Sequence, residues 1–284
     1  MFFRHKKSKI PKYLICALLC LFILGVLPSE GIAASKKKGF TISARSVIFS
    51  DSTRVKRLYG KNVHKKVIPA STVKVMTALL VLEKLPLNKI VTVSKRATKP
   101  QPSKIYARQG ERYRVADLLL AILIGSANDA SVVLAEAVAG SEWKFVNMMN
   151  QRAKELGCRH TKFANSHGLP TKQKQYTTAY DMYVIFMQAL KHPFFKKAIQ
   201  YKKKTIRSQG GRKIVLKNHN KSLFKKWKRN VYGKTGYTRK AKACFVGYIE
   251  KGKSILIIAI FGCASGRRWN EVKHIITKYG GIAL

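Results

Sequence analysis

Acidic residues are scarce in this sequence. The 284 residues include only 12 Asp and Glu against 57 Lys and Arg, which gives a formal net charge of +45 at pH 7. A cation of this size attracts polyanions through its summed field. The seven histidines form no His-Glu-x-x-His or comparable pattern, so we expect no metal site and no cofactor.

Cysteine is also rare, and its use excludes two classes of protein. Only Cys158, Cys244 and Cys263 lie beyond the N-terminal segment, and an odd number leaves at least one of them unpaired. Cys244 and Cys263 fall in strand-like apolar runs, where small buried residues are ordinary. We therefore expect neither a disulfide framework nor thiol catalysis.

The N-terminal apolar run is too short for a permanent spanning helix. It covers Tyr13–Leu27, follows a cluster of basic residues and precedes the small residues of Gly31–Ala33. This order is typical of a secretory signal peptide. We predict a signal peptide at residues 1–33 and a folded domain at residues 34–284, whose function the motifs below address. An uncleaved membrane anchor is the alternative.

Export changes the partner that the positive charge predicts. Nucleic acid is the default partner of a basic cytosolic chain, and we do not expect it here. Outside the cytoplasm the polyanions are phospholipid head groups and anionic cell-wall polymers. We expect an anionic cell-wall or membrane surface as partner, in the periplasm or on the extracytoplasmic face of a bacterial cell. The alternative is that the lysines form only a solvated surface.

Strand-like runs lie at both ends of the chain, and helical patterns fill the middle. The N-terminal runs are at 46–59 and the C-terminal runs at 243–249 and 255–262. This order predicts an α+β fold with one antiparallel sheet built from both chain ends and packed with helices. A helical subdomain is expected at about residues 90–191, and the cleft beside the sheet is where a site would lie.

Residues 68–83 contain the first candidate site. The almost wholly apolar run at 73–82 predicts a helix that is buried on all sides. Ser71 and Lys74 lie three residues apart at its start, so their side chains share a face and can touch. Burial favours the neutral amine of a lysine, and such a base can activate a serine hydroxyl.

The Ser-x-x-Lys pattern alone is weak. It also begins at Ser35, Ser141 and Ser222 of this lysine-rich chain. The alternative for Ser71 is an N-cap, with Lys74 extending to water. Only the Ser71 copy opens a buried helix and has suitable companions downstream.

The first companion is the pair Ser126 and Asn128, which lies in a sharp connection between two predicted helices. A hydroxyl and an amide two residues apart can point the same way from such a turn. An ordinary helix cap is the alternative interpretation.

The second companion lies in the segment 232–238, which is predicted as an edge strand. Lys234 supplies positive charge, Thr235 a hydroxyl, and Gly236 lets a substrate backbone approach closely. Gly-Lys-Thr also ends a phosphate-binding loop, but the position where that motif requires its first glycine is Lys228. A loop before a strand remains the alternative.

Together the three motifs form a specific combination. Ser-x-Asn follows Ser-x-x-Lys by 55 residues, and Lys-Thr-Gly follows after 108 more. Penicillin-binding proteins and class A β-lactamases share this set. The chain resembles the low-molecular-mass D-alanyl-D-alanine carboxypeptidases from about Ser43 to Gly281. The segments that carry the resemblance are Pro69–Lys74, Phe163–Pro170, Tyr176–Met182 and Lys234–Thr238. One departure is Ala127, where the family usually has glycine.

The resemblance implies a fold of the serine β-lactamase and penicillin-binding-protein type and a serine peptidase mechanism. Ser71 would attack the carbonyl between the two terminal D-alanines of a peptidoglycan stem peptide. Lys74 would be the base, and Ser126 would relay a proton to the leaving amine. Asn128 would hold Lys74 and the substrate amide. β-Lactam antibiotics would acylate the same serine.

The resemblance also implies how the substrate is held. Lys234 and Thr235 would bind its terminal carboxylate, and Arg268 is a further candidate for the same group. Gly236 would allow the close approach of the substrate. The backbone N–H groups of Ser71 and Tyr237 would form the oxyanion hole.

Three other functions share parts of this pattern. A serine β-lactamase of class A needs a glutamate for deacylation, and no acid between Asn128 and Lys234 occurs as Glu-x-x-Leu-Asn. A D,D-endopeptidase uses the same machinery on a longer leaving group. A non-catalytic, basic cell-wall-binding protein predicts the loss of a motif residue, yet all are present.

Overall fold

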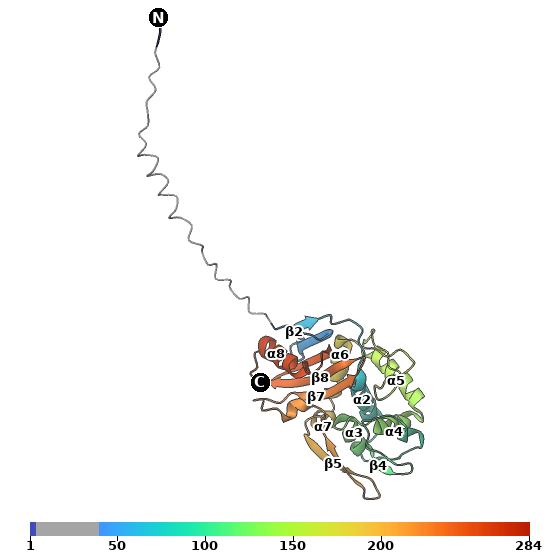
Figure 1. The fold of residues 1–284 in the computed structure, drawn as a ribbon. Coiled ribbons are helices and arrows are strands. Elements are labelled where there is room, and N and C mark those ends of the chain that lie inside the picture. The colour runs from blue at the N-terminus through green and yellow to red at the C-terminus, as the bar shows by residue number, and fades with distance from the viewer. Residues whose placement is uncertain (4–39) are drawn as a thin grey trace. The chain divides into compact units, whose positions relative to one another are not determined.

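The computed structural model describes residues 1–3 and 40–284 (Figure 1). Residues 41–284 form one compact unit. The predicted signal peptide, apart from its first three residues, lies outside the described residues. Within the described residues, no helix has both the length and the apolar character that a membrane span requires.

A five-stranded antiparallel sheet is the centre of the compact unit. Its strands lie in the order β2-β1-β9-β8-β7, so both ends of the chain meet in its middle. This arrangement confirms the predicted α+β fold. The strands are β1 (Ser46–Asp51), β2 (Lys56–Lys61), β7 (Tyr232–Thr238), β8 (Lys242–Lys251) and β9 (Ser254–Cys263).

The middle of the sheet is buried on both faces, and successive side chains of each strand point to opposite faces. In β9, Ile258 and Ile260 pack with the terminal helix α8 (Arg268–Gly280). Ile257 and Ala259 belong to the larger core on the other face. Helix α6 (Ala179–Leu190) packs there against β1 and β9. Figure 1 shows the sheet between α8 and α6.

The larger core also contains α2 (Lys74–Lys84), which is surrounded by other helices. The prediction of a buried helix is confirmed, since every residue from Lys74 to Val81 is buried. The remaining helices and strands are η1 (Ala70–Val73), β3 (Ile90–Thr92), η2 (Arg96–Thr98), β4 (Arg112–Arg114), α3 (Val115–Leu123), α4 (Asn128–Ala139), α5 (Glu142–Glu155), α7 (Pro193–Ala198), β5 (Lys203–Arg207), β6 (Lys213–Lys217) and η3 (Lys221–Phe224).

Ser71 lies in the 3₁₀ turn η1 and not in the first turn of α2 itself. Side chains three residues apart eclipse one another in a 3₁₀ helix. The approach of Ser71 to Lys74 is therefore at least as direct as the predicted α-helix would allow.

Two glycines let other segments come close to the backbone of Ser71. Gly168 has φ +88°, and a Cβ atom there would lie 2.0 Å from the carbonyl oxygen of Ala70. A Cβ atom on Gly236 of β7 would lie 3.1 Å from the backbone nitrogen of Ser71. Both the Gly168 loop and the edge strand thus contact the turn that carries the serine.

Candidate active site

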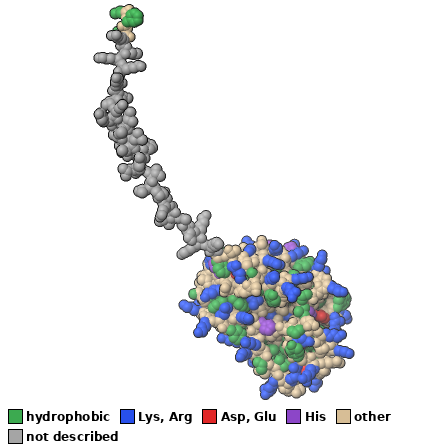
Figure 2. All heavy atoms as spheres, viewed as in Figure 1, with side chains coloured by type: hydrophobic (Ala, Val, Ile, Leu, Met, Phe, Trp, Pro, Cys, Tyr) green, Lys and Arg blue, Asp and Glu red, His purple; other side chains and the backbone are tan. Residues whose placement is uncertain are grey.

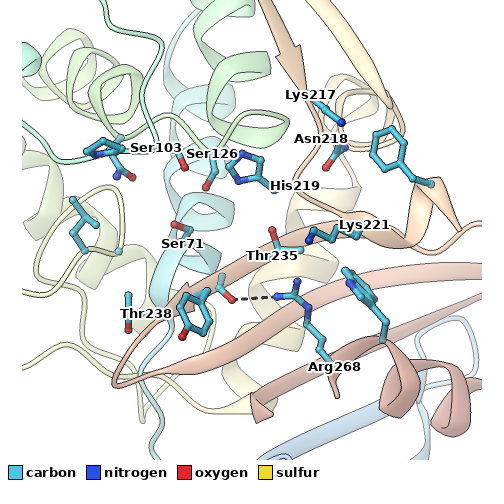
Figure 3. A pocket seen from close by; sticks show the side chains of 18 of the residues that line it. Ser71, Ser103, Ser126, Lys217, Asn218, His219, Lys221, Thr235, Thr238 and Arg268 are labelled. Atoms are coloured by element: carbon cyan, nitrogen blue, oxygen red, sulfur yellow. Dashed lines mark hydrogen bonds between the residues drawn. The ribbon is translucent and has the colours of Figure 1, made fainter. Parts of the chain in front are cut away.

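A cavity of about 900 Å³ opens over the end of the sheet, where η1, the α3–α4 connection and β7 meet (Figure 3). Its lining includes seven of the nine candidate residues named from the sequence. These are Ser71, Ser126, Asn128, Thr235, Gly236, Tyr237 and Arg268. Lys74 and Lys234, the other two, are buried beside it with exposed fractions of 0% and 1%.

The amine of Lys74 lies at the centre of the site. Its Nζ is 3.3 Å from Ser71 Oγ, 2.6 Å from Asn128 Oδ1 and 2.6 Å from the carbonyl oxygen of His167. The last two groups can only accept hydrogen bonds at these atoms. Lys74 therefore donates two of its protons to them.

This geometry suits a neutral amine. A neutral amine has two N–H donors and one lone pair, so donation to Asn128 and His167 leaves the lone pair for the hydroxyl of Ser71. Burial, helped by the nearby Lys234, holds the pKa of Lys74 well below its usual value. Asp129 acts in the opposite direction but more weakly. The arrangement is that of a base with its nucleophile.

Lys234 occupies the opposite side of the cavity floor. Its Nζ donates to Ser126 Oγ at 2.9 Å and to the carbonyl oxygen of Thr235 at 3.1 Å. Burial and the charge of Arg268 lower the pKa of Lys234 to about 7. Ser126 itself has φ +57°, an uncommon conformation for a residue other than glycine. The chain thus holds this hydroxyl against the buried amine of Lys234.

The loop that contains Gln101 and Ser103 fixes the position of Asn128. Its backbone N–H donates to the carbonyl oxygen of Ser103 at 2.7 Å, and its Nδ2 donates to that of Gln101 at 2.7 Å. The buried carboxylate of Asp129 accepts hydrogen bonds from the backbone N–H groups of Ile105 and Ala107. These contacts orient the amide oxygen of Asn128 toward Lys74.

Arg268 reaches the cavity from the start of α8. Its Nη1 donates to the carbonyl oxygen of Gly236 at 3.3 Å (Figure 3) and to that of Cys244 at 3.0 Å. Its Nε is buried and has no hydrogen-bond partner, the one such side-chain atom in the described part of the chain. A buried donor without a partner costs folding free energy, so this guanidinium is well suited to bind an anionic ligand.

Some partners in the site carry no signal in the sequence. The carbonyl oxygens of His167 and Gln101 are backbone atoms of irregular loops, and any residue could supply them. The lysines that line one wall of the cavity, Lys217, Lys221 and Lys225, do not stand out in the sequence from the many others of this basic chain. Their clustering becomes visible only in the folded structure.

The lining of the cavity includes no Asp or Glu among the described residues. Asp129 is buried beside Asn128, where its carboxylate binds backbone N–H groups, and Glu142 is linked to the site only through Ser166 and His167. It accepts hydrogen bonds from the backbone and hydroxyl of Ser166, and it lies 3.6 Å from His167 Nε2. This arrangement disfavours a class A β-lactamase, which needs a carboxylate at the deacylating water.

The three cysteines of the compact unit, Cys158, Cys244 and Cys263, are free and buried. Burial raises the pKa of Cys158 to about 12 and that of Cys244 to about 11. Such thiols are poor nucleophiles. Within the described residues, no group of three or more His, Cys, Asp or Glu side chains is placed to bind a metal ion.

Comparison with known proteins agrees with this geometry. The chain is 35% identical over 261 residues to the D-alanyl-D-alanine carboxypeptidase DacF of Bacillus subtilis (strain 168), covering 89% of this chain and 66% of that protein. It is 33% identical over 269 residues to DacC of Escherichia coli (strain K12), covering 90% of this chain and 66% of that protein. The chain thus spans about two thirds of the length of these relatives.

Solved structures give the same result for the fold. The D-alanyl-D-alanine carboxypeptidase of Mycobacterium tuberculosis H37Rv superposes with a TM-score of 0.78 at 27% identity, over 86% of this chain and 94% of that one. The sequence also matches the D-alanyl-D-alanine carboxypeptidase family over residues 32–265, which is most of its length. This protein therefore belongs to the D-alanyl-D-alanine carboxypeptidase family.

Proposed function

We propose that this protein is a serine-type D-Ala-D-Ala carboxypeptidase that removes the terminal D-alanine from peptidoglycan stem peptides and is inhibited by penicillins. The observation that carries the proposal is the geometry of the buried Lys74 amine. Its Nζ donates two hydrogen bonds, to Asn128 and His167, and lies 3.3 Å from Ser71 Oγ. Such a base beside a hydroxyl that lines the cavity serves acyl transfer.

In the proposed acylation step, Lys74 takes the proton of Ser71 as the serine oxygen bonds to the carbonyl carbon between the two D-alanines. The C–N bond then breaks, and the leaving amine receives a proton through Ser126. The proton delivered is the one that Lys74 took from Ser71, so Lys74 is neutral again after this step. The 2.9 Å contact from Lys234 Nζ to Ser126 Oγ supports this role, because it holds the relaying hydroxyl in place. The products are an ester on Ser71 and free D-alanine.

The terminal carboxylate is proposed to bind between Lys234, Thr235 and Arg268. Two of these groups carry positive charge, and Arg268 has an unpartnered Nε. The oxyanion of the tetrahedral intermediate would be held by the backbone N–H groups of Ser71 and Tyr237, each worth about 3–4 kcal/mol in comparable enzymes. Gly236 has no side chain, which lets β7 lie close to the backbone nitrogen of Ser71.

Deacylation completes the proposed cycle. A water molecule attacks the ester and gives a proton to Lys74. Lys74 passes that proton to the oxygen of Ser71 as the ester C–O bond breaks, which releases the shortened peptide as a carboxylic acid and returns both residues to their starting forms. Asn128 holds the amine through its Oδ1 in this step as in the first.

The surface charge of the protein agrees with action in an extracytoplasmic, anionic environment. Lys and Arg side chains cover the visible face of the molecule, and Asp and Glu are few (Figure 2). We propose that the protein is exported and acts at the cell wall, where such a surface binds anionic polymers or membrane head groups. Signal-peptide cleavage near Ala33 is part of this proposal.

Two assays on the wild-type protein test the proposal together. A synthetic pentapeptide ending in D-Ala-D-Ala is expected to release D-alanine catalytically, and labelled penicillin is expected to attach to Ser71 with hydrolysis slower than acylation. Mass spectrometry of the digested adduct identifies the labelled residue. Rapid penicillin turnover without D-alanine release would indicate a β-lactamase, and label on another residue would refute the assignment of the nucleophile.

The pH dependence provides a separate prediction. The pKa of Lys234 is about 7, so its positive charge is present below pH 7 and is lost as the pH rises through that value. The Lys74 amine is already neutral at pH 7 in this proposal, so its protonation state does not change as the pH rises further. We expect kcat/KM for D-alanine release to fall about tenfold between pH 7 and 9, because kcat/KM reports ionisations of the free enzyme.

The control is a peptide whose terminal carboxylate is replaced by a carboxamide. It has no negative charge for Lys234 to bind, so its smaller kcat/KM is expected to stay level over the same pH range. An equal alkaline fall for both peptides would assign the ionisation to another step.

A further inference from the structure

The cavity is larger than the release of one alanine requires. Figure 3 shows Ser103 and Thr238 on one side of Ser71, and Lys217, Lys221 and Arg268 on the other. The groups proposed for the terminal carboxylate lie on the second side, so the leaving residue lies there too. This step rests on the proposed function.

The second side continues beyond the carboxylate site. Its outer wall is formed by the end of the β5–β6 hairpin and by η3, which bring Lys217, Phe224 and Lys225 to the lining. Lys217 Nζ lies 5.7 Å from the centre of the Phe224 ring, an arrangement that steadies the amine by a cation–π contact. The side chain of a leaving residue would point toward this wall.

No negative charge balances the wall. The sequence has no Asp or Glu between Asp181 and Glu250. Within the described part of the chain, neither Lys217 nor Lys225 forms an ion pair. The nearby His219 is partly open to solvent, and its pKa is lowered to about 4 by desolvation first and then by the charges of Lys234 and Lys74. The field in this half of the cavity is positive and available to a ligand.

We propose that Lys217 and Lys225 form a subsite for a second carboxylate, carried by the side chain of the leaving residue. The substrate class is then a peptide in which D-alanine is joined to a dicarboxylic D-amino acid or to a peptide that bears such a group. The reaction is unchanged: Ser71 forms the ester, the C–N bond breaks, and the leaving amine takes a proton. The α-carboxylate stays with Thr235 and Arg268, while the second carboxylate contacts the lysine wall.

The test compares leaving residues of equal size. Three peptides share one acyl part and end in D-alanine, D-glutamate or D-glutamine. We expect kcat/KM for the D-glutamate peptide to exceed that for the D-glutamine peptide about tenfold. Each ion pair between an exposed lysine and the ligand carboxylate contributes a modest factor to kcat/KM. The double variant Lys217→Gln/Lys225→Gln is expected to bring this ratio close to one.

Lys213 and Lys226 provide the matched control. Each is an exposed lysine from the same strand or segment as a subsite lysine, and neither lines the cavity. The double variant Lys213→Gln/Lys226→Gln has the same net charge as the test variant and is expected to keep the wild-type ratio. An equal loss of preference in both double variants would show a general field effect and overturn the subsite.

Other outcomes are equally decisive. Labelling by penicillin reports that each variant is folded, and if the double variant is not labelled, each single variant is expected to lower the ratio about threefold. Equal rates for D-glutamate and D-glutamine in the wild type would overturn the subsite while D-alanine release still supports the proposed function. A lack of D-alanine release and of penicillin labelling would overturn both.

Discussion

Replacing Ser71 with alanine is expected to lower D-alanine release from a pentapeptide by about 10⁴-fold or more, because loss of the nucleophile removes the acyl-enzyme route entirely. The same variant is expected to lose covalent labelling by penicillin. The measurement is D-alanine formation under saturating peptide, with labelling followed by mass spectrometry.

The substitution is expected to leave the fold intact. Ser71 Oγ lies 3.3 Å from Lys74 Nζ, and without this hydroxyl the amine keeps Asn128 and His167 as partners. A thermal unfolding midpoint close to that of the wild type would check this point. Loss of activity would then come from the chemistry and not from unfolding.

Ser141 offers a matched control. It is followed three residues later by Lys144 and so has the same sequence pattern as Ser71, but it caps α5 and accepts a hydrogen bond from the backbone of Lys144. Ser141→Ala is expected to cost about 1 kcal/mol of stability as a lost cap and to retain D-alanine release. Full activity in Ser71→Ala would show that another residue is the nucleophile.

The contrast between Ser71 and Ser141 shows what the sequence can predict. Neighbouring positions on one helical turn follow from backbone geometry, so the approach of Ser71 to Lys74 is predictable from their spacing. The identical pattern at Ser141 forms a helix cap because the turn around it is polar. The hydrophobic context of Ser71, together with the companion motifs downstream, distinguishes the two serines in the sequence itself.

The sheet is predictable for a related reason. The strands β8 and β9 are nearly continuous apolar runs, and such runs are buried on both faces. Helix α7 was not predicted, because six residues after His192 give too short a pattern to detect. Nor does any local pattern show that Arg268, at the start of α8, leaves its Nε unpartnered beside the cavity.

The lysine wall is not predictable from sequence. Lys217 and Lys225 are eight residues apart, at the end of β6 and directly after η3, and each resembles the other basic residues around it. Only the folded structure shows that both side chains line the same cavity. A cluster of residue types that are common throughout the chain leaves no distinctive local signal.

The second large effect is expected for Lys74. Changing it to alanine is expected to slow acylation of Ser71 by about 10³-fold, the usual contribution of a general base. Single-turnover labelling with penicillin measures this step directly. Lys144→Ala, the partner of the control serine, is expected to have no effect on the same rate.

Lys74→Ala also leaves a space in the core and two acceptors without a donor, at Asn128 Oδ1 and His167 O. Each unsatisfied group costs about 1–3 kcal/mol, so the variant is expected to be less stable than the wild type. Labelling at a temperature well below its unfolding midpoint separates this loss from the catalytic one.

Lys74→Arg distinguishes a base from a fixed cation at this position. Arginine keeps hydrogen-bond donors for Asn128 and His167, but it stays protonated at any pH that proteins tolerate. If Lys74 acts as the neutral amine that its burial and the nearby Lys234 favour, the arginine variant remains as slow as the alanine variant. An acylation rate near that of the wild type would mean that position 74 supplies only positive charge, and the proton of Ser71 would then need another acceptor.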